Sequence, residues 1–165
     1  MKTIGLLGGM SWESTALYYR LINEGARRAL GGTHSAPIAM VSVDFHEIEA
    51  LQHAGDWGET AKILSRKARQ VEQAGADFLL ICTNTMHKVA DEVQAAIDIP
   101  LLHLADATAH RIKESGMSTI GLLGTRFTME QAFYRGRLES HDLKVLVPQA
   151  DEREIVHRVI YQELC

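Results

Sequence analysis

A thiol, two hydroxyls, a carboxamide and an imidazole fall within six residues, in the run from Cys82 to His87. The run follows an apolar segment and precedes a helical pattern, so we expect it where a buried strand ends and a helix begins. The N-terminus of a helix favours negative charge, which suits a substrate carboxylate, and a nearby base could act on the adjacent C–H bond. Asn84 or Thr85 would suffice to cap the helix, and the surplus of polar groups favours a functional site.

Cys82 has two interpretations. A thiol at a helix N-terminus has a lowered pKa and can serve as a base. Free cysteine is also among the most buried residue types, and Cys82 ends an apolar strand, which favours a place in the core.

A second polar turn, from Gly8 to Ser14, also follows a strand and opens a helix. Its backbone N–H groups could hold a carboxylate, or its glycines could simply serve a tight turn. Neither Gly-x-Gly-x-x-Gly nor Gly-Lys-Ser/Thr is present, which argues against a nucleotide site. The eight histidines show no ligand spacing, so we expect no metal site.

Strand-like and helix-like segments alternate along the chain, which predicts an α/β fold: a parallel sheet with helices on both faces. The carboxyl ends of parallel strands meet at one edge, so both polar turns should lie there. We expect strands at 2–7, 37–43, 77–82, 100–104, 118–123 and 143–147, and helices at about 11–30, 60–73, 85–97, 105–115, 128–139 and 151–165.

The hexapeptide Thr-Ile-Gly-Leu-Leu-Gly occurs at residues 3–8 and again at 119–124, an offset of 116 (119 − 3). This repeat predicts two pseudo-symmetric α/β lobes, the first at 1–116 and the start of a second at 117–165. Adding 116 to position 82 gives 198, beyond the last residue of this sequence, so we expect the second lobe to be incomplete here.

The composition is that of a globular protein, with 165 residues, 46% hydrophobic residues and a net charge of −4. A negative net charge gives no excess of basic residues for binding nucleic acid or an anionic membrane. We see no signal peptide, no apolar run of ~20 residues and no disulfide framework, and therefore expect a cytoplasmic protein without nucleic-acid or membrane partners. Open strand edges in a half-built second sheet would favour a homo-oligomer.

The chain resembles the aspartate/glutamate racemase family along its entire length. The likeness rests on Lys2–Met10, the Asn84-Thr85-x-His87 box, Gly121–Thr125 and the stretch 151–161, and it is closest to bacterial members with a Cys-Thr-Asn-Thr-Met-His run. The resemblance implies an isomerase of amino-acid metabolism that needs no cofactor and has its active site in the cleft between two similar lobes. In this family one cysteine removes the Cα proton and another, from the second lobe, returns a proton to the opposite face.

By resemblance the catalytic position is Thr83, because the family cysteine immediately precedes Asn-Thr-x-His. A shift of one residue turns a side chain to the opposite face of a strand, and the sequence leaves open whether Cys82 or Thr83 faces the cleft. A hydroxyl is a far poorer base than a thiolate, so we expect one enantiomer to be favoured as substrate. The family's second motif, Gly-Cys-Thr-Glu, does not occur in these residues. We assign Cys165 no catalytic role and expect a chain of this length to be inactive or nearly so.

The resemblance implies aspartate or glutamate as substrate, with neither PLP nor a metal. Arg126 is either an extra charge near the cleft or a solvated loop residue. The alternatives are a non-catalytic binder of small dicarboxylates and, by fold analogy alone, a phosphate or nucleotide enzyme. The substrate contacts implied by position are Met10, Ser11, Asn84, Thr85 and Thr125.

Overall fold

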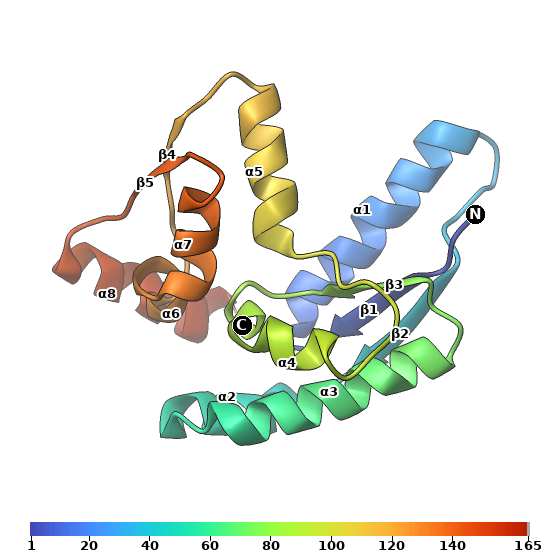
Figure 1. Cartoon of the computed structure of the whole chain (residues 1–165), viewed down its shortest axis with the longest axis horizontal. Coiled ribbons are helices and arrows are strands. Elements are labelled where there is room, and N and C mark those ends of the chain that lie inside the picture. The colour runs from blue at the N-terminus through green and yellow to red at the C-terminus, as the bar shows by residue number, and fades with distance from the viewer. Residues whose placement is uncertain (165) are drawn as a thin grey trace. The chain divides into compact units, whose positions relative to one another are not determined.

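The computed structural model describes residues 1–164, which form two compact units (Figure 1). The first unit contains Met1–Thr83 and Val89–Leu101. The second contains Asn84–Lys88 and the chain from Leu102 onwards. The predicted lobes, 1–116 and 117–165, were inferred from the repeated hexapeptide, and they stay a prediction.

A three-stranded parallel sheet forms the centre of the first unit. Its strands are β1 (Ile4–Gly8), β2 (Ile38–Ser42) and β3 (Phe78–Ile81), in the order β2-β1-β3. The central strand β1 pairs with both neighbours, and its Leu6 and Leu7 are fully buried. A continuous apolar strand is typical of such a position because both faces are covered. The expected parallel sheet is therefore confirmed.

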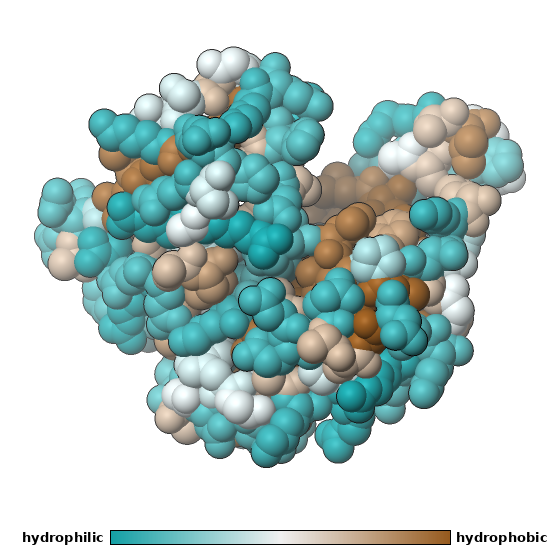
Figure 2. Space-filling view, viewed as in Figure 1, coloured by the Kyte–Doolittle hydropathy of each residue, from teal (hydrophilic) through white to brown (hydrophobic). Residues whose placement is uncertain are grey.

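Helix α3 (Trp57–Gln73) packs against all three strands of this sheet, as Figure 1 shows. Leu64, Ala68 and Val71, which lie at helical spacing, are fully buried there. The other helices of the unit are α1 (Trp12–Leu30), α2 (Phe45–Ala54) and α4 (Ala90–Gln94). Figure 2 shows hydrophobic groups reaching the surface over part of this unit.

Helix α1 differs from the expectation in the face that it buries. In the sequence, Leu17, Leu21 and Ile22 form the apolar side of this helix, which predicts that they point inward. In the structure Leu17 and Leu21 are 45% and 48% exposed, and Thr15 is buried instead. The helix turns Thr15 toward the glycine turn that follows β1, where a Cβ atom at Gly8 would meet the Thr15 side chain. Close contact between a small side chain and a glycine thus decides the rotation of the helix.

Two further segments differ from the sequence expectation. Residues 45–54, where the sequence predicted no helix, form helix α2, and Asp44 caps it by accepting a hydrogen bond from the His46 amide at 3.1 Å. The helix expected at 85–97 is a 3-10 turn, η1 (Thr85–Val89), followed by the short α4.

The second unit contains a two-stranded parallel sheet, with Ile120 opposite Val145. The strand expected at 100–104 is only an isolated bridge between Leu79 and Leu101 in the first unit, because the chain enters helix α5 at Leu104. The helix expected at 128–139 is broken at Gln131, whose backbone is extended. The elements are α5 (Leu104–Glu114), β4 (Thr119–Gly121), α6 (Arg126–Glu130), α7 (Ala132–Glu139), β5 (Lys144–Leu146), α8 (Ala150–Val159) and the π-helical turn η2 (Ile160–Leu164).

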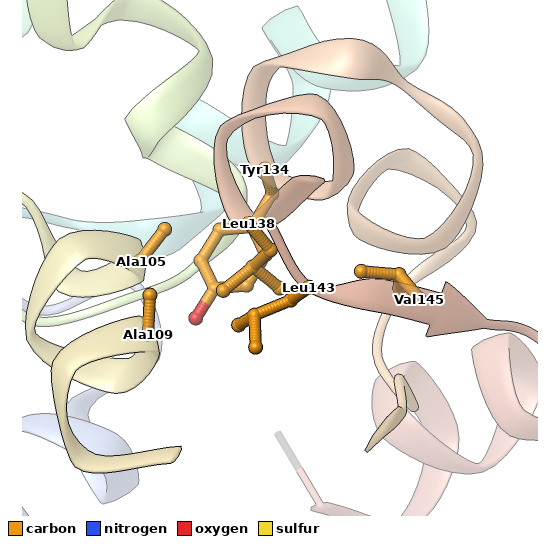
Figure 3. Packing of buried hydrophobic residues seen from close by; sticks show 6 residues of the cluster. All are labelled: Ala105, Ala109, Tyr134, Leu138, Leu143 and Val145. Atoms are coloured by element: carbon orange, nitrogen blue, oxygen red, sulfur yellow. The ribbon is translucent and has the colours of Figure 1, made fainter. Parts of the chain in front are cut away.

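A small apolar core joins α5 to α7 in the second unit (Figure 3). An ion pair reinforces this contact, since Arg137 donates to both carboxylate oxygens of Asp106 at 2.7 and 2.8 Å. His141 lies 3.0 Å from the same carboxylate. The core residues are Ala105, Ala109, Tyr134, Leu138, Leu143 and Val145.

Within residues 1–164, no helix combines the length and the apolar character needed to cross a membrane.

Candidate functional site

The first polar turn, between β1 and α1, is held in place by glycine and threonine. Gly9 has a φ of 91°, and a Cβ atom there would collide with the backbone of Val43. The Thr15 hydroxyl accepts a hydrogen bond from the Gly9 amide at 2.9 Å and donates one to the Ser11 carbonyl at 3.1 Å. Met10 and Ser11, both predicted substrate contacts, are thereby fixed in a buried turn of the first unit.

The first turn of α1 also contacts the end of β3 within the same unit. The Ser14 hydroxyl donates to the Cys82 carbonyl at 2.9 Å, and the Cys82 amide donates to the Leu7 carbonyl at 2.9 Å. These two hydrogen bonds hold the turn after β1 next to the end of β3. Thr83, the next residue, lies beside this junction.

Glu13, in the first turn of α1, was missed by the sequence interpretation. Its Oε2 atom is buried and has no hydrogen-bond partner among residues 1–164. Leaving a buried polar atom unsatisfied is unfavourable, so such atoms often mark a functional position. The signal was weak in the sequence because an acidic residue in a first helical turn is ordinary.

Cys82 and Thr83 have different surroundings at the end of β3. The Cys82 side chain is fully buried, and burial raises the pKa of its thiol to about 12. Thr83 is only partly buried. The thiol is therefore neutral near pH 7 and enclosed in the core, which makes it unsuitable as a base.

In the second unit the fold brings together two predicted site residues that lie forty positions apart. The Thr85 and Thr125 hydroxyl oxygens are 3.0 Å apart, and both residues are buried. The Thr125 hydroxyl is in turn 3.2 Å from that of Thr128 and accepts from the Thr128 amide at 3.4 Å. Asn84 is exposed, and its carbonyl accepts a hydrogen bond from the His87 amide at 3.1 Å.

Two buried histidines lie beside this turn. Their rings meet edge to face, with centroids 4.4 Å apart, and His87 and His103 are 3% and 7% exposed. Burial lowers the pKa of His103 to about 3, and the nearby His87 and Arg137 add to this effect. The sequence interpretation missed His103, because the helix was expected to begin at 105 whereas it begins at Leu104, which makes His103 its N-cap.

Arg126 has a local partner in the second unit. Its guanidinium lies 3.3 Å from the Glu154 carboxylate, and both side chains are at least half exposed. The Arg126 amide donates to His157 Nδ1 at 3.2 Å. This exposed ion pair favours the solvated interpretation of Arg126, since such pairs contribute little to stability.

The described residues contain no cluster of three or more His, Cys, Asp or Glu side chains that could hold a metal ion. The expected independence from metal and cofactor stays a prediction. Cys165 lies outside the described residues.

These features define an α/β protein in which small hydroxyl and amide side chains occupy the turns after parallel strands. The sequence profile of the Asp/Glu/Hydantoin racemase family matches residues 7–163, and the chain belongs to this family. The resemblance inferred from the glycine turns and the Asn-Thr-x-His box is thus confirmed.

Solved structures and a curated relative agree with this assignment. A candidate Asp/Glu racemase from Yersinia pestis is 59% identical, with a TM-score of 0.92 over 100% of this chain and 72% of its own. PH1733, an aspartate racemase homologue from Pyrococcus horikoshii OT3, is 36% identical, with a TM-score of 0.86 over 99% of this chain and 72% of its own. The broad specificity amino-acid racemase RacX from Bacillus subtilis (strain 168) is 26% identical over 97% of this chain. The chain spans 66% of the length of RacX.

Proposed function

We propose that the protein is an amino-acid racemase that acts on aspartate or glutamate without a cofactor, with Thr83 at the catalytic position. The observation that carries this proposal is the contrast between Cys82, fully buried with its thiol pKa raised to about 12, and the partly exposed Thr83. RacX is described as a broad specificity amino-acid racemase, and PH1733 as an aspartate racemase homologue.

The Cα–H bond of an amino acid is a very weak acid, so a racemase must stabilise the negative charge that develops when the proton leaves. A threonine hydroxyl is a poor base but can donate a proton. In this proposal a thiolate, which the family resemblance assigns to the second lobe, removes the proton from one face of Cα. Thr83 returns a proton to the opposite face, and its oxygen then regains a proton from solvent. One enantiomer is therefore the favoured substrate.

The substrate contacts are proposed from the family resemblance, residue by residue. Met10 and Ser11 serve in the first unit, where backbone amides of the glycine turn suit a carboxylate. The buried oxygen of Glu13 suits the substrate ammonium group, because a charged donor would satisfy it. In the second unit the proposed contacts are Asn84, Thr85 and Thr125.

The test is hydrogen exchange at Cα, measured by proton NMR in D2O with L- and D-aspartate and L- and D-glutamate in turn. The full protein is used, and its intact mass is recorded first. We expect one enantiomer of at least one substrate to lose its Cα proton signal much faster than its mirror image. Replacing Thr83 by Ala should slow racemisation by about 100-fold or more.

Calorimetric titration separates the racemase from a non-catalytic binder of dicarboxylates. Binding of aspartate without any Cα exchange would overturn the proposed activity and support the binder. The absence of both binding and exchange would overturn both interpretations.

A further inference from the structure

His87 and His103 are buried, in contact with each other and without a role in the proton transfer described above. The backbone amide of Leu104 donates to His87 Nε2 at 3.2 Å, and the amide of Ala105 donates to His103 Nδ1 at 3.1 Å. Both amides belong to the start of helix α5, where backbone N–H groups have no partner within the helix. The two imidazoles thus act together as a cap for α5.

Each of these contacts fixes a tautomer. An imidazole nitrogen accepts a hydrogen bond only when it carries no proton. His87 must therefore carry its hydrogen on Nδ1, and His103 must carry its hydrogen on Nε2. Protonation of either ring would remove an acceptor and place a positive charge at the positive end of the α5 dipole.

The charged surroundings of His103 also favour the neutral ring. His87 and Arg137 both disfavour a positive charge there, and the Asp106 carboxylate is the one group that favours it. That carboxylate is already bound by both nitrogens of the Arg137 fork and by His141. Its charge is therefore largely compensated at the position of His103.

The anchored His87 ring constrains the turn that precedes it. The His87 amide closes this turn by donating to the Asn84 carbonyl at 3.1 Å. Thr85 lies inside the closed turn, with its hydroxyl 3.0 Å from that of Thr125. His87 is therefore bonded to the start of α5 through its ring and to Asn84 through its backbone amide.

We propose that His87 and His103 are positioning residues: as a neutral pair of hydrogen-bond acceptors they fix residues 84–87 against helix α5 and thereby orient Thr85 toward the substrate. This inference rests on the proposed racemase function for the identity of the substrate. The geometry of the pair itself does not depend on that function.

The first experiment compares a variant that keeps the acceptor with one that loses it. The amide oxygen of Gln can take the place of Nε2 in His87→Gln, whereas His87→Leu offers no acceptor. We expect His87→Leu to raise KM for the exchanging amino acid about tenfold with a smaller change in kcat, and His87→Gln to restore KM to within about threefold of the native value. Equal KM values for the two variants would overturn the proposal.

A matched pair at the second ring tests the same idea. His103→Asn places an amide oxygen where an N-cap acceptor is needed, and His103→Leu does not. We expect the Asn variant to bind aspartate with nearly native affinity and the Leu variant to bind about tenfold more weakly. His110→Gln, on the exposed side of the same helix, is the control and should change neither KM nor affinity.

A further measurement uses the native protein, so it does not depend on whether a variant folds. Long-range proton–nitrogen NMR of the native protein should show an unprotonated Nε2 on His87 and an unprotonated Nδ1 on His103, unchanged between pH 8 and pH 5. Protonation or tautomer exchange of either ring in this window would overturn the proposal. If the tautomers are as expected and the His103 pair differs in aspartate binding while no Cα exchange occurs, the proposed activity fails and the positioning role stands.

Discussion

The hydroxyl oxygens of Thr85 and Thr125 lie 3.0 Å apart in a buried part of the second unit, although forty residues separate them in sequence. Thr85 comes from the turn that follows β3, and Thr125 caps the helix that follows β4. The contact matters because the family resemblance assigns both residues to the substrate site from sequence alone.

Replacing Thr85 by Val keeps the shape of the side chain and removes its hydroxyl. We expect the free energy of unfolding to fall by about 1 kcal/mol, because the Thr125 hydroxyl loses a buried partner. Affinity for aspartate should fall by about tenfold if the hydroxyl contacts the substrate. Urea denaturation and calorimetric titration measure the two effects.

The control for this change is Thr119→Val, the same substitution at an exposed position of β4. It should alter neither stability nor affinity by a measurable amount. A Thr85→Val protein that binds aspartate as tightly as this control would contradict the substrate contact.

Replacing Glu13 by Gln tests the unpartnered oxygen at the start of α1. The native carboxylate has one buried oxygen without a hydrogen-bond partner among the described residues. We expect the amide variant to be at least as stable as the native protein and to bind aspartate about tenfold more weakly, because a charged contact to the ammonium group is lost. Glu24→Gln, in an exposed part of the same helix, is the control. Unchanged affinity in Glu13→Gln would remove Glu13 from the site.

The Asp106–Arg137 pair should contribute to stability in a pH-dependent way. Hydrogen bonds from Arg137 hold the pKa of Asp106 well below its usual range, against the opposing effect of burial. A carboxylate with a lowered pKa stabilises the fold above its unfolded pKa, near 4, and loses this contribution as the pH falls further. Both side chains are more than a third exposed, so solvent screens part of this attraction. We therefore expect Asp106→Asn to lower the free energy of unfolding by roughly 1 kcal/mol at pH 7, with a shrinking difference below pH 4.

The comparison for this pair is Asp142→Asn. Asp142 lies 3.3 Å from Lys113, but its side chain is 94% exposed. Exposed ion pairs contribute about 0–1 kcal/mol, so this variant should stay close to the native protein at every pH. Equal losses in Asp106→Asn and Asp142→Asn would show that the two hydrogen bonds from Arg137 to Asp106 have no special effect.

Histidine burial should weaken the fold in mild acid. The pKa of His103 is lowered to about 3, so the folded state keeps this ring neutral while the unfolded chain takes up a proton near pH 6.5. Above pH 6.5 this histidine does not reduce the free energy of unfolding. As the pH falls from 6.5 toward 3, the unfolded chain binds a proton that the folded state does not, and the free energy of unfolding declines. Chemical denaturation between pH 7 and pH 4 should show a smaller decline in His103→Asn than in the native protein. Identical pH profiles would contradict the burial of a neutral ring.

The strands of the first unit could be predicted because apolar runs such as Lys2–Leu7 have few alternatives to a central parallel strand. The site residues could be placed at strand ends for the same reason. The rotation of α1 could not be predicted, since Leu17 and Leu21 make a regular apolar pattern and the contact between Gly8 and Thr15 overrides it. Propensity is a weak guide where tertiary contacts decide.

The environment of Cys82 and the partners of His103 also lay beyond the sequence. Whether a strand-end thiol is buried depends on the side chains that cover it, and these come from other elements. His103 is not a usual capping residue, and only its contact in the fold, with its Nδ1 atom 3.1 Å from the Ala105 amide, defines this role. Both findings arise from packing between distant segments.

The most direct test of the central claim is racemisation of the favoured amino acid, followed by the appearance of its mirror image and compared between Thr83→Ala and Cys82→Ala in the full protein. We predict that Thr83→Ala slows racemisation by about 100-fold or more, because the proton donor on one face is gone. Cys82→Ala should keep near-native racemisation despite some loss of stability, since its thiol is buried. Loss of racemisation in a folded Cys82→Ala, with native rates in Thr83→Ala, would contradict the account.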